Sequence, residues 1–211
     1  MEKEAHVTGF AALDVETTGL SPAVDRVIEI GVVLLDESGA PESTWETYVN
    51  PGVPVRATHI HGISDDDVAG APSFSDIAER LLGLLEGRAV VGHSVGFDVG
   101  FINAELANAG FRDRIEMSMS VCTLDQSRVY LADGRHSLGA CAERAGIPKT
   151  VSHRALADAE TSGALLAHYI SLEGAGARVQ AAPIDRWGNQ VLPAQWERAR
   201  PFVRSQATLW T

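Results

Sequence analysis

Three segments rich in β-forming residues follow one another within the first fifty residues, before any helical pattern begins. Thr8–Val15 is a short apolar run with the acidic residue Asp14 near its end. Val27–Leu35 (VIEIGVVLL) is dominated by β-branched side chains, and Thr44–Val49 alternates polar and apolar residues. The segment TTGLSPAVD between the first two contains the Gly and Pro residues of a turn. The opening of the chain therefore predicts a meander of three strands.

The remainder of the chain alternates between helical patterns and one further buried strand. We expect this strand at Arg88–Gly92. Helical spacing or helical composition marks Ser73–Leu85, Phe97–Ala109, Val121–Leu131, Ser137–Ala145 and Ala155–Leu172. Strands followed by strand–helix alternation predict a mixed α/β domain that ends near Leu172. The 211 residues suit one such domain with an appendage.

Charge limits the classes of partner. The chain has 17 basic and 28 acidic side chains, a formal net charge of −11. This balance argues against a general nucleic-acid coat protein and against a polybasic membrane binder. The charge is unevenly distributed, however, since residues 1–127 carry a net −14 and residues 174–211 a net +3. The second half of the chain could therefore face a polyanion.

Cysteine content and apolar run length bear on the compartment. Cys122 and Cys141 are the only cysteines, and no C-x-x-C is present, which predicts two reduced thiols. The first residues lack the pattern of a signal peptide. The longest strongly apolar stretch, Ile30–Leu35, is far below the ~20 residues that a membrane helix needs. We expect a cytoplasmic protein without a membrane partner.

Asp14 and Glu16 lie two residues apart at the end of the first predicted strand. Alternate residues of a strand point to one face, so both carboxylates project together. Like charges at that separation repel unless something binds them. A solvated strand end would explain an isolated pair equally well. The Thr-Thr-Gly-Leu turn that follows offers hydroxyls, backbone amides and an apolar side chain, a mixture that suits the end of a substrate.

Two further acidic residues and a histidine extend this pair. Asp98 comes just after the buried strand, near a predicted helix start, and HRALADA places His153 on a loop five residues before helix-borne Asp158. Each alone has an ordinary structural explanation. Together the four carboxylates form an oxygen-rich set that suits Mg²⁺ or Mn²⁺ rather than zinc, and they suffice for two ions. A histidine with a pKa near ~6.5 can accept a proton from an attacking water.

Three separated motifs carry a family resemblance: FAALDVETTGL at Phe10–Leu20, VVGHSVGFDVGFINAEL at Val90–Leu106, and HRALADA at His153–Ala159. In order and spacing they resemble the DEDD exonuclease superfamily, in its DnaQ-like histidine subgroup. Asn50–Val68 is similar to the segment leading to H-G-I in bacterial epsilon-type proofreading subunits. The tyrosine subgroup would have Tyr where this chain has Arg154, whereas the position before it fits the histidine subgroup.

This resemblance implies a ribonuclease-H-like α/β fold, with a five-stranded mixed sheet flanked by helices and its second strand antiparallel. It implies metal ligation by Asp14, Glu16, Asp98 and Asp158, with two Mg²⁺ or Mn²⁺ ions as cofactors and His153 as general base. The activity implied is 3′→5′ hydrolysis of single-stranded nucleic acid, DNA favoured, to nucleoside 5′-monophosphates, in proofreading or repair. The substrate contacts implied are Thr17, Thr18, Leu20, His61, Ile63, Phe97 and Phe101, and core packing would explain the aromatic and apolar ones equally well.

Two other functions stay open from the sequence. One is an RNA-trimming exoribonuclease of the same family, because the contacts that separate ribose from deoxyribose cannot be placed. The other is a non-catalytic scaffold in a replication complex, although a scaffold need not keep four converging acids. The acidic charge predicts weak, metal-dependent binding directed to 3′ ends.

Residues 174–211 follow the predicted exonuclease domain of residues 1–173 and hold three of the four tryptophans. They are too apolar for a plain linker, so we expect this tail to pack on the domain or on a second subunit. Gln206–Trp210 resembles the Q-x-x-L-aromatic peptide that binds bacterial sliding clamps. A clamp or a polymerase is therefore a candidate partner.

Overall fold

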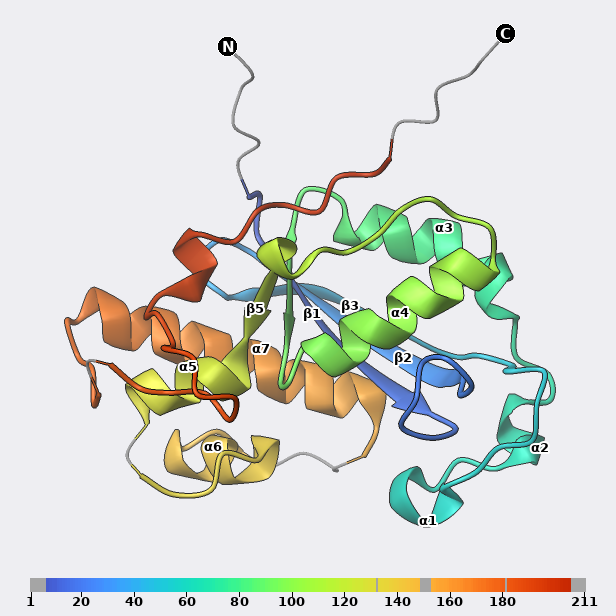
Figure 1. Ribbon diagram of the computed structural model, residues 1–211, viewed down its shortest axis with the longest axis horizontal. Helices are drawn as coiled ribbons and strands as arrows, with labels where there is room; N and C mark the ends of the chain where they lie inside the picture. The colour runs from blue at the N-terminus through green and yellow to red at the C-terminus, as the bar shows by residue number, and fades with distance from the viewer. Residues whose placement is uncertain (1–6, 132, 149–152, 181, 206–211) are drawn as a thin grey trace, which may run out of the picture.

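A five-stranded mixed sheet forms the centre of the molecule (Figure 1). The computed structural model describes residues 7–131, 133–148, 153–180 and 182–205. The strands are β1 (Phe10–Thr17), β2 (Val27–Leu35), β3 (Pro41–Tyr48), β4 (Ala89–Gly92) and β5 (Ser120–Cys122). Their order is β3-β2-β1-β4-β5; β2 is antiparallel to both neighbours, and β1, β4 and β5 are parallel. The predicted mixed sheet with an antiparallel second strand is confirmed.

Helices cover both faces of this sheet. They are α1 (Thr58–His61), α2 (Asp65–Val68), α3 (Phe74–Leu85), α4 (Gly96–Asn108), α5 (Thr123–Tyr130), α6 (Leu138–Arg144) and α7 (Ala155–Gly174), with 3₁₀ turns at Met117–Met119 and Gln195–Glu197. The alternation of β1 divides the core: Leu13 packs in the cluster of α3 and α4, whereas Ala12 packs in the cluster of α5, α6 and α7. The strand end therefore presents its side chains to two different helical layers.

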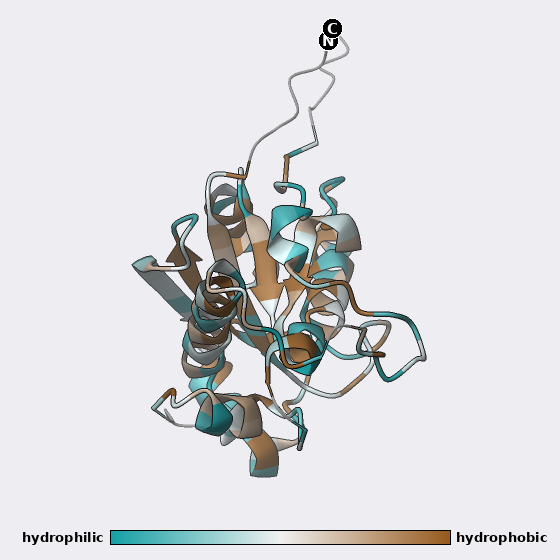
Figure 2. Cartoon of the chain, turned by 90° about the vertical axis from the view of Figure 1, so that its left-hand side faces the viewer, coloured by the Kyte–Doolittle hydropathy of each residue, from teal (hydrophilic) through white to brown (hydrophobic). Residues whose placement is uncertain are grey.

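The hydropathy of the strands follows their position in the sheet. β2 is buried along almost its whole length, since helices cover both of its faces. β3 (PESTWETY) lies at the edge of the sheet, and most of its residues are exposed. Figure 2 shows the apolar centre in brown and the more hydrophilic outer surfaces in teal.

Strand β5 differs from the sequence prediction, which placed a helical piece over Val121–Leu131. The structure has a strand at Ser120–Cys122, and helix α5 begins at the next residue, Thr123. Val121 pairs with Val91 in the parallel ladder to β4. A three-residue strand joined directly to a helix gives no alternation of its own, so its apolar residues merge with the helical pattern.

The tail packs closely against the rest of the chain. Phe202 is completely buried; its N–H donates to Arg88 O (2.8 Å), and its carbonyl accepts the Gly87 N–H (2.9 Å). Trp196 is 8% exposed, with its ring centroid 5.7 Å from that of Tyr130 in α5. In Figure 1 the tail passes beside α5 and then crosses the top of the molecule. The domain limit at residue 173 stays a prediction, and Gln206–Trp210 lies outside the described residues.

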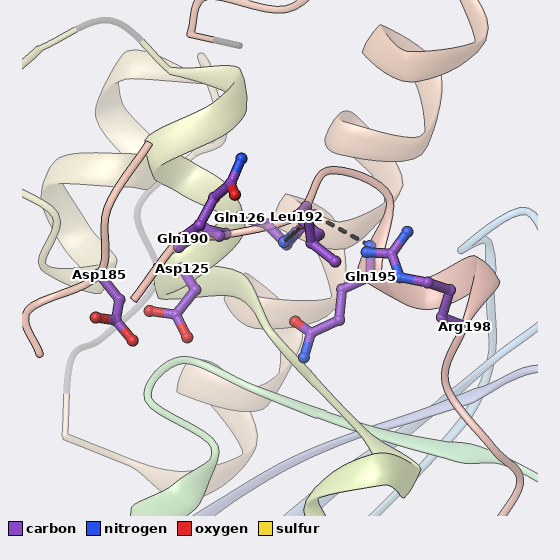
Figure 3. Close-up of a pocket in the computed structure, with 8 residues that line it drawn as sticks. Asp125, Gln126, Asp185, Gln190, Leu192, Gln195 and Arg198 are labelled. Carbon is purple, nitrogen blue, oxygen red and sulfur yellow. Dashed lines mark hydrogen bonds between the residues drawn. The ribbon is translucent and has the colours of Figure 1, made fainter. Parts of the chain in front are cut away.

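A small polar pocket marks the seam between α5 and the tail (Figure 3). Side-chain hydrogen bonds of two glutamines hold the tail at this position. Gln126 Nε2 donates to Leu192 O (2.9 Å), and the Cys122 N–H donates to Gln195 Oε1 (2.9 Å). Within the part of the chain that the structure describes, no helix is long and apolar enough to cross a membrane.

Candidate active site

A pocket of about 350 Å³ opens where β1, α4 and the start of α7 meet. Its lining residues are Asp14, Val15, Glu16, His93, Ser94, Phe97, Asp98, His153, Asp158 and Arg186. The four predicted carboxylates and the predicted histidine thus line one pocket. Its volume is at the low end for ligand sites and suits one nucleotide-sized group.

Unequal strand lengths create this site. The parallel ladder between β1 and β4 stops at Ala12 and Val91, whereas β1 continues to Thr17. Asp14 therefore lies on a part of β1 with no strand on its β4 side. Asp98, in the first turn of α4, fills this gap, and its Oδ1 accepts the Val15 N–H (3.2 Å). This buried hydrogen bond joins the end of the central strand β1 to the start of helix α4.

Crowding of the acids disfavours their charged forms. Burial, followed by the negative charges of Asp98, Asp158 and Glu16, raises the pKa of Asp14 well above its usual range. Burial is also the main cause that raises the pKa of Asp98 to about 8 and that of Glu16 to about 7. Each raised pKa favours the protonated carboxyl, and a divalent cation would displace that proton.

The segment before α7 brings a nitrogen ligand to the same place. His153 is exposed and has a left-handed backbone (φ +63°), and its N–H donates to Asp158 Oδ2 (3.2 Å). One potential ligand atom from each of Glu16, His153 and Asp158 lies within 4.8 Å of the other two. This spacing and donor set fit a divalent cation, as the predicted cofactor requires.

Two features hold the start of α7 against the sheet. Glu29 of β2 accepts hydrogen bonds from Arg154 Nε (2.9 Å) and, through its other oxygen, from the Ala155 N–H (2.9 Å). Gly31, which pairs with Asp14 across the ladder, has no room for a side chain because a Cβ would lie 2.2 Å from Leu156 N. This close approach carries Asp158 to the β1 carboxylates.

Sequence reasoning missed three polar residues of the pocket. His93 is held by Thr123 Oγ1 (3.0 Å at Nδ1) and by His136 O (2.8 Å at Nε2), and burial lowers its pKa to about 4. Ser94 has φ +73°, a conformation uncommon outside glycine. Both follow β4 within the quoted GHSVGFD motif, which was a usable signal. Arg186 comes from the tail, and no local sequence pattern predicts that it lies at this pocket.

The predicted aromatic contacts divide into one pocket residue and one core residue. Phe97 lines the pocket, whereas Phe101 is completely buried in the core beneath it, with ring centroids 4.9 Å apart.

Both predicted threonines use their hydroxyls within the turn after β1. The Thr17 hydroxyl donates to Gly19 O (2.6 Å), and the Thr18 hydroxyl accepts the Arg26 N–H (3.0 Å). Leu20, in the same turn, is 84% exposed. None of these three residues lines the carboxylate pocket. Their substrate role stays a prediction.

His61 and Ile63 lie around the short helices α1 and α2, apart from the carboxylates. The His61 ring contacts Arg56 O (3.1 Å) and accepts the Ile63 N–H (3.1 Å). Ile63 is 2% exposed and packs in a small cluster with Ile28 and Val68. The structure gives both residues packing roles and does not bring them into the pocket. Their contact with substrate likewise stays a prediction.

Comparison with known proteins places this geometry in a family. An exonuclease family model of the RNase T type matches residues 11–166. The epsilon subunit of DNA polymerase III from Treponema pallidum is 32% identical over 173 residues, which cover 78% of this chain and 80% of that one. The PolC-type DNA polymerase III of Pediococcus pentosaceus is 30% identical over 195 residues, which are 91% of this chain but only 13% of the relative.

The fold has a counterpart among solved structures. E. coli exonuclease I in complex with a dT13 oligonucleotide superposes with a TM-score of 0.66 at 18% identity, over 76% of this chain and 40% of that one. The chain belongs to the exonuclease family, a class of 3′–5′ exonucleases that hydrolyse phosphodiester bonds. The predicted family, enzyme class and ribonuclease-H-like fold are confirmed.

Proposed function

We propose that the protein is a metal-dependent exonuclease that removes nucleoside 5′-monophosphates from the 3′ end of single-stranded DNA, in proofreading or repair. The observation that carries this proposal is the convergence of Asp14, Glu16, Asp98, Asp158 and His153 on one pocket. A scaffold has no need of four crowded carboxylates, which cost stability when no cation is bound.

The side chains have distinct tasks in this reaction. The four carboxylates would hold two Mg²⁺ or Mn²⁺ ions, which polarise the scissile phosphate and lower the pKa of the attacking water. His153 accepts the proton of that water, since this residue is exposed and precedes α7. The hydrogen bond from its N–H to Asp158 keeps the segment near the carboxylates. Asp98 holds the end of β1 through Val15 N.

The pocket also supports attack at a chain end. Its volume of about 350 Å³ suits one nucleotide-sized group, so the rest of a strand must lie outside. Phe97, on the pocket wall, can pack against the nucleotide that enters.

The test is hydrolysis of a 5′-labelled single-stranded DNA with Mn²⁺ or Mg²⁺, with Asp158→Asn as the deficient variant. We expect a ladder shortened from the 3′ end and no ladder from Asp158→Asn. Glu160→Gln is the matched control, because Glu160 is exposed in the same helix and does not line the pocket. Equal metal-dependent activity in Asp158→Asn and the natural chain would overturn the proposal.

Substrate panels separate the remaining alternatives. We expect single-stranded DNA to be degraded faster than RNA of the same sequence. Faster loss of RNA would identify an exoribonuclease. Metal binding without hydrolysis of any polymer would identify a scaffold.

Association with a replicative polymerase or a sliding clamp is part of the proposal. The similarity to an epsilon subunit of DNA polymerase III supports the polymerase. The clamp rests on Gln206–Trp210 alone. Removal of residues 206–211 should abolish binding to a bacterial clamp, and an intact chain that does not bind would refute that partner.

A further inference from the structure

The tail contributes a hairpin to the rim of the carboxylate pocket. The Asp185 N–H donates to Asn189 O (2.8 Å), and Ile184 and Gln190 form an isolated antiparallel bridge. Asp185 Oδ1 accepts the backbone N–H groups of Trp187 (2.8 Å) and Asn189 (2.8 Å). We refer to residues 184–190 as the tail hairpin. Its internal hydrogen bonds give its tip, Arg186 and Trp187, a defined conformation.

Hydrogen bonds hold the base of the hairpin, at the end opposite its tip. Val191 N–H donates to Pro183 O (2.9 Å), and Gln126 of α5 donates to Leu192 O (2.9 Å). Figure 3 shows Asp185 and Asp125 of α5 at the same end of the pocket in this seam. The hairpin base therefore rests on α5, while Arg186 reaches the separate pocket of the carboxylates.

Arg186 is the one Lys or Arg residue among the described residues that line the carboxylate pocket. No ion pair engages its guanidinium in the described part of the chain. In contrast, ion pairs with carboxylates engage other arginines: Arg26, Arg88, Arg154, Arg178, Arg200 and Arg204. A guanidinium that no described carboxylate engages, beside a phosphodiester site, is suited to a phosphate, which it can bind through two parallel hydrogen bonds.

Trp187 adds an aromatic surface next to this cation. It is 74% exposed, and the Arg186 guanidinium carbon lies 4.8 Å from its ring centroid. An exposed indole beside a phosphate-binding cation is the combination that holds single strands without sequence preference. The net +3 of residues 174–211 agrees with this use, because the rest of the chain is strongly acidic.

We propose that the tail hairpin is a second binding site for the substrate strand, in which Arg186 pairs with a backbone phosphate and Trp187 stacks on a base. This inference rests on the proposed exonuclease function. A 3′-terminal nucleotide carries only the scissile phosphate. Since the carboxylates and their cations would hold that phosphate, we assign Arg186 to the next phosphate on the 5′ side, and a trinucleotide is the shortest substrate that supplies it.

The decisive measurement is the dependence of KM on substrate length, in Mn²⁺, for a dinucleotide without a 5′-phosphate, a trinucleotide and a twelve-residue oligonucleotide. For Arg186→Ala and Trp187→Ala, we expect KM to rise about five-fold or more on the longest substrate. Arg186→Ala should also raise KM on the trinucleotide. Neither variant should change KM on the dinucleotide.

Two control variants distinguish loss of the Arg186 charge or the Trp187 ring from a general loss of folding. Arg200→Ala removes the same charge from the same tail outside the pocket, and Trp187→Phe keeps a ring; both should behave as the natural chain does. Arg186→Ala should also reduce the slope of log affinity against log salt by about 0.7, and Trp187→Ala should leave that slope unchanged.

Affinity for a fluorescent oligonucleotide, measured in the Asp158→Asn background, separates this inference from the proposed function. Binding that depends on Arg186 and Trp187, together with a natural chain that hydrolyses no polymer, would refute the function but keep the site. Active variants with unchanged KM and affinity would refute the site, as would an equal KM increase on the dinucleotide.

Discussion

The two walls of the pocket are built in different ways. Asp14 and Asp98 belong to a wall formed by β1 and α4, in which one carboxylate accepts a buried backbone N–H and Val15 packs in the core. The opposite wall is the segment from His153 to Asp158, where the histidine is exposed and has a left-handed backbone. The first wall owes its position to packing, the second to a few anchoring contacts. In the proposed reaction, this arrangement would separate the carboxylate ligands of the first wall from the exposed proton acceptor, His153.

The largest effect expected from the second wall is on the rate. His153→Ala should lower kcat by about 10²–10⁴-fold, because a positioned general base is removed. The thermal shift produced by Mn²⁺ should persist if the carboxylates hold the metal without the imidazole. Loss of that shift in His153→Ala would instead make His153 a metal ligand, which its distance to Glu16 and Asp158 allows. Glu160→Gln, exposed in α7 and outside the pocket, is the control.

A variant at the close contact between β2 and α7 tests whether the position of the second wall depends on that contact. Gly31→Ala should destabilise the fold by about 1–3 kcal/mol or more and abolish most activity, since a Cβ there would meet the backbone of Leu156 at 2.2 Å. Gly163→Ala, further along α7, is the control: its nearest atom is the end of a leucine side chain at 3.2 Å. Thermal melts and single-turnover rates of both variants check this. Equal behaviour would show that α7 can shift freely.

Removing one anchor of the second wall should have a smaller effect. Glu29→Gln weakens the contacts to Arg154 and to the Ala155 N–H, and we expect a loss of about 1.5–3 kcal/mol in the free energy of unfolding. Because Asp158 moves with this segment, kcat should fall more than KM rises. Urea melts and steady-state kinetics measure both. Glu79→Gln, at an exposed ion pair with Arg204, should cost far less.

The first wall is best tested by pH. In unfolded chains these carboxyls have pKa values near ~4, whereas the structure raises the pKa of Asp98 to about 8 and that of Glu16 to about 7. The folded state therefore binds more protons, and stability falls as pH rises from about 4 to about 8. The melting temperature of the metal-free protein should decrease over this range, by about 2–4 °C per kcal/mol lost. Added Mn²⁺ should restore it most at the alkaline end. A metal-free melting temperature that rises with pH would contradict this.

The first wall was readable from the sequence to a greater extent than the second. The two-residue spacing of Asp14 and Glu16 on an apolar strand fixes their shared side, and Asp98 follows a buried strand at a helix start. In the structure these acids line one pocket. The sequence could not show that β1 extends beyond its ladder with β4, or that the start of α7 packs directly on Gly31. Those features depend on pairing register and on contacts between distant segments.

Three further features of the structure were not predicted from the sequence, each for a different reason. β5 was hidden because its three residues adjoin a helix. Helices α1 and α2 have four residues each, too few for a helical period, although Ser64 and Asp67 form a capping box that was visible in the sequence. The path by which the tail carries Arg186 to the pocket depends on packing at Trp196 and Gln126, which local patterns do not encode.

The fixing of the tail at Phe202 has a practical consequence for handling the protein. Ser205, three residues later, donates to Asp113 beyond the C-terminal end of α4, whereas Asp98 lies in the first turn of that helix. Asp98 and Asn108, the last residue of α4, are separated by about 15 Å along the helix axis. A surface linker attached through Ser205→Cys would therefore leave the carboxylate pocket turned toward solution, which suits immobilised or single-molecule assays.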